Sequence, residues 1–337
     1  MNVTEFRAGT ANWTAVSKTR TTRVGAAIDI GSNSIHLLVA RLDSSPAASR
    51  HGLTTLEDRS VLLGLGDVVD ADRVIPTDTC VQIIDAVVDY AALSAEAGAH
   101  RLALIGTEPL RRAQNANTVA AAVLDNTGYE LHIISVDQEA ELTVLGVTGG
   151  RAPDFPLIVV DIGGGSTEVG IYRPGAALEV AALPIGSARL TNSLVHNDPP
   201  TEEELDLLHD AVAKIRALLP TLSGNGRQGE LQAVFVGGTA TNLARLGRLS
   251  RAGLAEDRRL LHEMESAAIT EHFGVRPRRA RQLAAGAAIV EVLLAHFGID
   301  EAVVSTASLR DGAIIAEWRF GDEWPKRLSE HFAQPAG

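Results

Sequence analysis

Two short stretches of the sequence join an aspartate to glycines and hydroxyl side chains. The first covers residues 29–34 (DIGSNS) and the second residues 161–168 (DIGGGSTE). Glycine has no Cβ, so backbone N–H groups in such a turn can approach a phosphate closely. A carboxylate beside them can hold Mg²⁺, a hard ion that takes oxygen ligands. The candidate residues for this chemistry are Asp29, Asp161, Gly31, Gly163, Gly164 and Gly165.

Both stretches lie between two apolar runs, which is the pattern of a β-hairpin with the glycines at its tip. The hairpins align without gaps at a constant offset of 132 residues, which places Asp29 on Asp161 and Ser34 on Ser166. Either hairpin alone could be an ordinary glycine turn with a capping aspartate. Two in register indicate two lobes descended from one unit.

A third glycine turn, Gly237-Gly238-Thr239, follows an apolar strand at 232–236 and opens a helix at Ala240. Its N–H groups could also meet a phosphate or a nucleotide. A Gly-Gly turn between a strand and a helix is as often a plain packing feature. This turn alone is therefore a weak candidate.

Two glutamates and two arginines complete the candidate chemistry. Glu139 opens a helix and Glu168 lies on the strand that leaves the second turn; a carboxylate so placed can activate the water that attacks a phosphate ester or anhydride. Arg111 and Arg310 follow strand ends, where a guanidinium can clamp phosphate oxygens. The alternatives are an ordinary N-terminal helix acid for Glu139, whose neighbours at 137 and 141 are also acidic, and ion pairs for the arginines.

Strands and helices alternate along the chain that positions these residues. This alternation predicts sheets with helices packed against them, an α/β fold. We expect hairpins over 24–41 and 156–172, and strands at 102–105, 131–134, 178–183, 232–236 and 302–304. We expect helices from Pro76 to Gly98, at 116–124 and 138–146, after Thr201, from Ala240, at 278–297 and at 308–318, with an irregular region around residues 64–66.

Composition sets the outer limits. A chain of 337 residues with 45% hydrophobic and 21% charged residues is globular, and its length favours two lobes. A net charge of −12 argues against a protein that coats nucleic acid or adheres to anionic membrane. The single cysteine, Cys80, and the lack of a signal peptide or a long apolar run predict a soluble cytoplasmic protein, with residues 1–23 as a flexible tail.

In their order along the chain, these motifs resemble the exopolyphosphatase and guanosine pentaphosphate phosphatase (Ppx/GppA) family over residues 24–318. The resemblance implies two actin/Hsp70/sugar-kinase-like (ribonuclease H-like) lobes around a central cleft. The first lobe would cover 24–146, with the helix at 308–330 packed back on it, and the second 147–307. It also implies a Mg²⁺-dependent (or Mn²⁺-dependent) hydrolase that removes terminal phosphate from polyphosphate or guanosine pentaphosphate, and a homodimer.

The resemblance also implies roles for single residues. Glu139 would activate water, and Arg111 would face the phosphate. Asp29, Asp161 and Glu168 would lie at the metal, with Glu168 also at the attacked phosphate. The phosphate-binding set would comprise Gly31, Ser32, Asn33, Ser34, Gly163, Gly164, Gly165, Ser166, Thr167, Gly237, Gly238, Thr239 and Arg310. The sequence departs from the family pattern at Glu108-Pro109, where small residues are usual, at His36, where arginine is frequent, and at residues 136–138.

Two other functions fit the same motifs. A kinase or ATPase of this fold would hold a nucleotide at Gly237-Gly238-Thr239, and a binding module would sense an alarmone without hydrolysing it. We favour the hydrolase, because a binding module needs no water-activating acid such as Glu139. Residues 245–281 contain nine arginines against five acids, a local charge of +4 that leaves −16 for the rest of the chain. This stretch is expected to line the approach of a phosphate chain, or else to be a solvated helix face.

Overall fold

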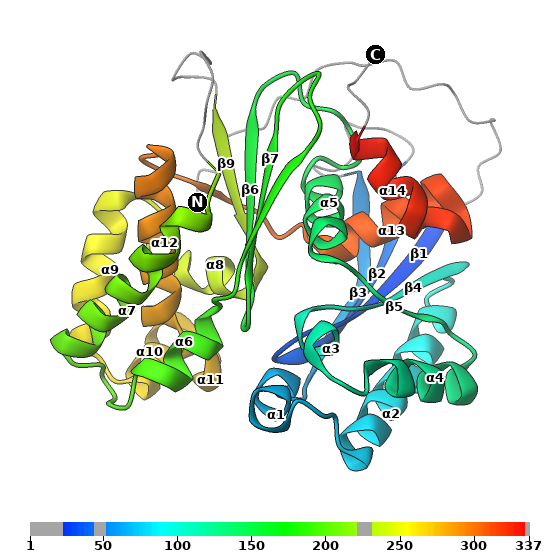
Figure 1. Ribbon diagram of the computed structural model, residues 1–337, viewed down its shortest axis with the longest axis horizontal. Helices are drawn as coiled ribbons and strands as arrows, with labels where there is room; N and C mark the ends of the chain where they lie inside the picture. Colours follow the sequence, from blue (N-terminus) through cyan, green and yellow to red (C-terminus); the bar gives the residue numbers. More distant parts are fainter. Residues whose placement is uncertain (1–22, 44–51, 221–230, 334–337) are drawn as a thin grey trace. The chain divides into compact units, whose positions relative to one another are not determined.

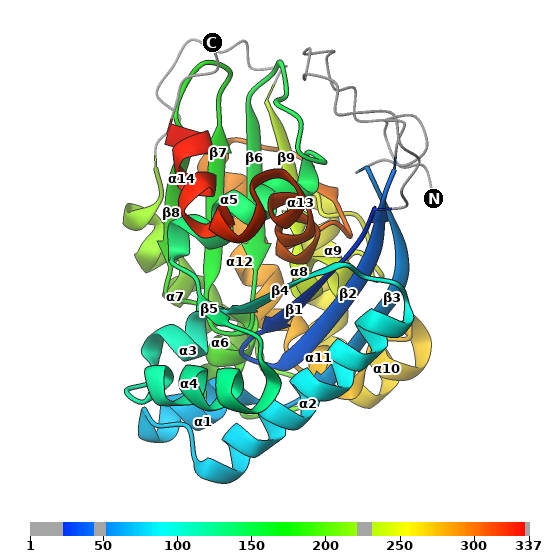
Figure 2. The same ribbon diagram turned by 90° about the vertical axis from the view of Figure 1, so that its right-hand side faces the viewer.

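The computed structural model describes residues 23–43, 52–220 and 231–333 (Figures 1 and 2). The tail expected at 1–23 lies outside the described residues apart from Arg23. The chain divides into two compact units. The first lobe comprises the described residues up to Asp154, Arg173–Leu178 and those from Ala307 onward, and the second lobe comprises Phe155–Tyr172 and Glu179–Thr306.

The first lobe is built on a five-stranded sheet of order β3-β2-β1-β4-β5. The hairpin β1–β2 is antiparallel, whereas β1, β4 and β5 run parallel. Because parallel strands end at the same edge of a sheet, the residues that follow β1, β4 and β5 come together there. The strands are β1 (Arg23–Ile30), β2 (Ser34–Leu42), β3 (Leu53–Leu62), β4 (Arg101–Gly106) and β5 (Leu131–Ile133).

Helices cover both faces of this sheet. Alternate residues of β1 face opposite sides: Ile28 belongs to the core beneath α2 and α4, and Ala27 to the core beneath α5, α13 and α14. Helices α5 and α13 cross closely at Gly146 and Gly312, where a Cβ would clash with backbone of the facing helix. The helices are α1 (Leu65–Asp72), α2 (Thr77–Glu96), α3 (Glu108–Arg112), α4 (Ala116–Thr127), α5 (Val136–Val147), α13 (Leu309–Phe320) and α14 (Trp324–Ala333).

The second lobe repeats this plan. Its sheet has the order β10-β9-β6-β7-β8, in which the antiparallel hairpin β6–β7 and the parallel neighbour β9 correspond to β1–β2 and β4. The internal repeat predicted from the two hairpins thus extends to the whole sheet. The strands are β6 (Leu157–Ile162), β7 (Thr167–Tyr172), β8 (Glu179–Leu183), β9 (Gln232–Val236) and β10 (Val303–Val304).

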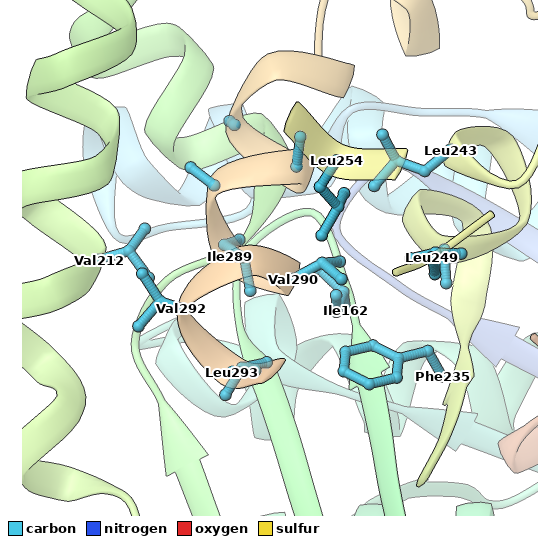
Figure 3. Close-up of a cluster of buried hydrophobic side chains, with 14 of the residues drawn as sticks. Ile162, Val212, Phe235, Leu243, Leu249, Leu254, Ile289, Val290, Val292 and Leu293 are labelled. Carbon is cyan, nitrogen blue, oxygen red and sulfur yellow. The ribbon is translucent and has the colours of Figure 1, made fainter. Parts of the chain in front are cut away.

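Helix α12 forms the centre of the second-lobe core. Figure 3 shows Ile289, Val290 and Leu293 of this helix beside Ile162 of β6 and Phe235 of β9. A helix that is apolar on nearly all sides has to be buried, as this one is. The helices of the lobe are α6 (Ser187–Leu194), α7 (Glu202–Lys214), α8 (Gly237–Leu243), α9 (Arg251–Glu263), α10 (Ser266–Phe273), α11 (Pro277–Ala280) and α12 (Leu283–Phe297), with a 3₁₀ turn at Ile215–Leu218.

Several expected elements need correction. The single helix expected over 278–297 is two helices, α11 and α12. They are separated by a tight turn in which Gln282 N donates to Arg279 O, three residues back, at 3.0 Å. The region expected to be irregular around residues 64–66 is α1, and strand β3 precedes it. Helix α8 begins at Gly237 and not at Ala240, and α14 follows the helix expected to be the last. Among the described helices, none is both long and apolar enough to cross a bilayer.

Candidate active site

The turn between β1 and β2 carries the first motif. Gly31 N donates to Ser34 O at 3.1 Å and closes the turn, while Asp29 lies at the end of β1. The segment before α1 fixes the backbone of this turn, because Leu63 N and Gly64 N donate hydrogen bonds to Asn33 O at 3.1 and 3.0 Å. Among the described residues, the buried Asn33 Nδ2 has no hydrogen-bond acceptor. An amide donor in this position suits an anionic ligand.

The turn between β6 and β7 is built in the same way. Gly163 N donates to Ser166 O at 3.0 Å, the counterpart of the bond in the first turn. Helix α6 supports this turn, because Ser187 N and Arg189 N donate to Gly163 O and Gly164 O, each at 3.0 Å. The repeat seen in the sequence is therefore a repeat of hydrogen bonds as well as of residue types.

The third glycine turn lies beside Asp161. Strand β9 is the parallel neighbour of β6, and its last residue, Val236, pairs with Asp161. The next residue, Gly237, therefore lies beside the Asp161 carboxylate. Gly237 has φ +84°, and a Cβ there would clash with Asp161 Oδ1, so both the backbone and the space require glycine. Glu168 is the cross-strand partner of Asp161 on β7. The second lobe thus brings together Asp161, Glu168 and the turns at 163–167 and 237–239.

Arg279 on α11 is a residue that motif reasoning did not single out. Its guanidinium lies 3.1–3.2 Å from the position of a Cβ on Gly238, against the third turn. It donates to Gln282 Oε1 at 3.3 Å, and in the described part of the chain no carboxylate pairs with it. Burial lowers the pKa of Arg279, and the charges of Arg278 and Arg276 lower it further. A half-buried guanidinium among other cations is suited to an anionic ligand.

In the first lobe, the buried Glu139 pairs with the half-buried Arg111. Arg111 Nη1 donates to Glu139 Oε2 at 2.6 Å and to Ile134 O at 3.1 Å. Helix α5 begins in a capping box made by Ser135 and Gln138, which fixes Glu139 in the first turn. Burial raises the pKa of Glu139, the paired Arg111 opposes the rise, and the charge of Glu108 adds to it. Glu139 is 7% exposed, so it differs from an ordinary solvated acid at a helix start.

Glu108, the residue that departs from the family pattern, is also buried at this edge. It is the first residue of α3, directly after the turn that follows β4. Its Oε2 accepts a hydrogen bond from Ser32 Oγ at 3.2 Å, and its Oε1 accepts one from Arg112 Nη1 at 2.8 Å. Arg112 also forms an ion pair with Asp70 of α1. The carboxylate is thus tied directly to a residue of the first turn.

The structure gives other predicted residues different partners. Arg310 Nη1 donates to Asp58 Oδ1 at 2.9 Å and to Leu37 O at 3.2 Å, so it makes the ion pair considered as its alternative. A phosphate contact by Arg310 stays a prediction. In the stretch 245–281, four arginines pair with acids of the second lobe: Arg248 with Glu301, Arg251 with Asp300, Arg258 with Asp206 and Glu202, and Arg281 with Asp198. The local excess of arginine is therefore largely offset.

The acids at the turns suit a hard cation, but not as one preassembled cluster. Asp29 lies in the first lobe, and Asp161 and Glu168 lie in the second. In the described ranges, no group of three or more histidine, cysteine, aspartate or glutamate side chains is placed to hold a metal. Mg²⁺ commonly takes only one or two protein carboxylates, with waters and phosphate oxygens as its other ligands. The oxygen donors at each turn are compatible with that demand.

Comparison with known proteins identifies the family. Residues 45–319 match the model of the Ppx/GppA phosphatase family. The chain belongs to this family. Exopolyphosphatase 2 of Mycobacterium tuberculosis is 31% identical over 323 residues, which cover 88% of this chain and 98% of that protein. The crystal structure of the Aquifex aeolicus Ppx/GppA family member matches with a TM-score of 0.74 at 28% identity, over 88% of this chain and 98% of that one.

A guanosine-5'-triphosphate,3'-diphosphate pyrophosphatase of Photobacterium profundum is a more distant relative. It is 25% identical over 304 residues, which cover 86% of this chain but 58% of that protein. Membership of the Ppx/GppA family confirms the predicted α/β class with actin-like lobes. It also confirms the predicted enzyme class, a hydrolase that acts on phosphoanhydrides.

Proposed function

We propose that this Ppx/GppA family member is an exopolyphosphatase that releases terminal orthophosphate from inorganic polyphosphate, with guanosine pentaphosphate as a second substrate. The ion pair between the buried Glu139 and the half-buried Arg111 carries the proposal, because it places a carboxylate of raised pKa at the sheet edge that bears the first glycine turn. We propose polyphosphate as the main substrate because the alignment spans 98% of the exopolyphosphatase relative. The alignment with the guanosine pyrophosphatase spans only 58% of that protein.

In the proposed reaction, Glu139 accepts a proton from water as the water oxygen attacks the terminal phosphorus. The bond from that phosphorus to the bridging oxygen breaks, the bridging oxygen keeps the electron pair, and orthophosphate and a shortened chain result. A base works best when its pKa lies near the operating pH, so the raised pKa of Glu139 suits the role. Arg111 holds the carboxylate in place.

Backbone N–H groups and arginine would hold the phosphates. Apart from Gly31 N and Gly163 N, which close their own turns, the donors would come from residues 31–34, 163–167 and 237–239, and Arg279 lies against the last of these turns. Donors aimed at the developing negative charge are an effective means of stabilising a phosphoryl-transfer transition state. Asp29, Asp161 and Glu168 would hold Mg²⁺ (or Mn²⁺), and the bound ion would neutralise charge on the phosphate oxygens.

A cytoplasmic homodimer is part of the same proposal. Cys80 is the single cysteine of the chain and a free thiol, so the chain forms no internal disulfide that would favour an oxidising compartment. Light scattering of the purified chain tests the dimer. A mass that corresponds to one chain at all concentrations would contradict it.

The deciding experiment measures orthophosphate release from long polyphosphate, tripolyphosphate, guanosine pentaphosphate and ATP, each with Mg²⁺ and with EDTA. We expect release from polyphosphate in Mg²⁺, and a loss of at least about 100-fold in kcat for Glu139→Gln, because a general base contributes roughly that much. Asp137→Asn is the matched control, since Asp137 is an exposed acid on the same helical turn. Full turnover by Glu139→Gln, or consumption of ATP alone with an acceptor, would refute the proposal.

A further inference from the structure

The first-lobe turn carries a negative charge where a phosphate would bind. Glu108 is 7% exposed, and its Oε2 accepts the hydrogen bond from Ser32 Oγ at 3.2 Å. A carboxylate only accepts hydrogen bonds, so the hydroxyl proton of Ser32 points at Glu108. Ser32 then offers a lone pair, and not a proton, to an incoming ligand. A phosphate oxygen would meet an acceptor where the turn should supply a donor.

The nearby arginine does not remove this charge. Arg112 Nη1 pairs with Glu108 Oε1 at 2.8 Å, but the same guanidinium also pairs with Asp70. The positive charge of Arg112 is therefore shared between two carboxylates, of which Glu108 is the one that contacts Ser32. Because Glu108 and Ser32 are buried or half-buried, water screens the charge of Glu108 less than it screens charges at the surface.

We propose that Glu108 makes phosphate binding at the first-lobe turn depend on a divalent cation. It does so by orienting the Ser32 hydroxyl away from the phosphate and by placing a carboxylate, whose partner Arg112 is shared with Asp70, beside the turn; a bound cation would offset that carboxylate's repulsion of phosphate. Glu108 is thus a positioning residue. It acts by orienting the Ser32 hydroxyl and through the negative electrostatic potential of its carboxylate at the turn. This inference rests on the proposed function, since it concerns the same phosphate site.

The test measures the affinity for tripolyphosphate by titration calorimetry in EDTA and in saturating Mg²⁺. In EDTA, Glu108→Gln should bind about threefold more tightly than the wild type, because it loses the charge but can still accept from Ser32. Glu108→Ser should gain about tenfold, because it also frees the hydroxyl. In saturating Mg²⁺, the affinities of both variants for tripolyphosphate should lie closer to that of the wild type than they do in EDTA. Asp70→Asn is the control and should stay within about twofold, since Asp70 shares Arg112 but does not contact Ser32.

A double-mutant cycle separates the hydroxyl from the charge. Ser32→Ala should weaken binding in EDTA by a larger factor in the Glu108→Ser background than in the wild type, because the hydroxyl donates to phosphate only when Glu108 is gone. Equal factors in both backgrounds would overturn the proposal. So would folded Glu108 variants that bind tripolyphosphate in EDTA no more tightly than the wild type. Wild-type orthophosphate release in Mg²⁺ tests the proposed function separately, so either can fail alone.

Discussion

At the scale of single residues, burial gives side chains their chemistry. Glu139 and Asp137 lie in the first turn of one helix, but Glu139 is buried against Arg111 and Asp137 is exposed. Burial raises the pKa of Glu139, and the bond from Arg111 fixes its orientation. The sequence predicts acids at this helix start, but it does not show which of them faces inward, because that depends on how α5 packs.

Asp257 is a buried acid that the proposed chemistry does not use. Burial, and secondarily the charge of Glu256, raise the pKa of Asp257 from 3.8 to about 6. Between these values the folded state binds more protons than the unfolded state, so the stability contributed by Asp257 falls as pH rises through this window and stays lower above it. Asp257→Asn should therefore raise the free energy of unfolding by on the order of 2 kcal/mol at about pH 7.5, because each pKa unit is worth about 1.4 kcal/mol.

Urea unfolding at several pH values checks this prediction. The stabilisation by Asp257→Asn should shrink steadily as the pH falls towards the unfolded value. Glu256→Gln should give a smaller gain of the same sign, because Glu256 is the minor cause of the shift. A gain that does not change with pH would show that the charge of Asp257 is not its source.

At the scale of elements, the sequence was most informative where a motif fixes a turn. The hairpins at the two aspartates, β4, β9 and the capped helix after Thr201 were found because apolar runs, glycines and caps mark them locally. Strand β3 was missed because much of it is exposed and polar, so it lacks the alternation that a half-buried strand shows. Arg279 was missed because nothing local separates it from eight other arginines; its place against Gly238 depends on the fold.

The crossing of α5 and α13 leaves no room for an added Cβ at its glycines. A Cβ on Gly312 would clash with the backbone of Leu142. Gly312→Ala should force the helices apart and cost about 1–3 kcal/mol of unfolding free energy, as overpacking does. Gly128→Ala is the comparison: its φ of +75° is unfavourable for alanine, but nothing lies within 4 Å of the added Cβ. It should cost roughly 1 kcal/mol. Equal denaturation midpoints for wild type and Gly312→Ala would contradict the close crossing.

At the scale of the whole molecule, the repeat gives each lobe a glycine turn of the same hydrogen-bond pattern, but the side chains beside the two turns differ. The first lobe holds Arg111 and the buried acid Glu139, which we propose as the base. The second holds Arg279 and the third glycine turn. If the proposed function is right, loss of the base should affect kcat, and loss of the second-lobe arginine should affect substrate binding.

Arg279→Gln tests this division of labour. We expect KM for polyphosphate to rise about 10- to 100-fold, because a charge-assisted hydrogen bond to a phosphate contributes about 1.5–3 kcal/mol. The acid limb of the kcat–pH profile should not move, because that limb reports the base in the other lobe. Arg259→Gln is the matched control: it removes the same charge from an exposed position of the second lobe, so KM should change less than about twofold. An equal rise in KM for both variants would mean that net charge, and not the guanidinium at Gly238, determines polyphosphate binding.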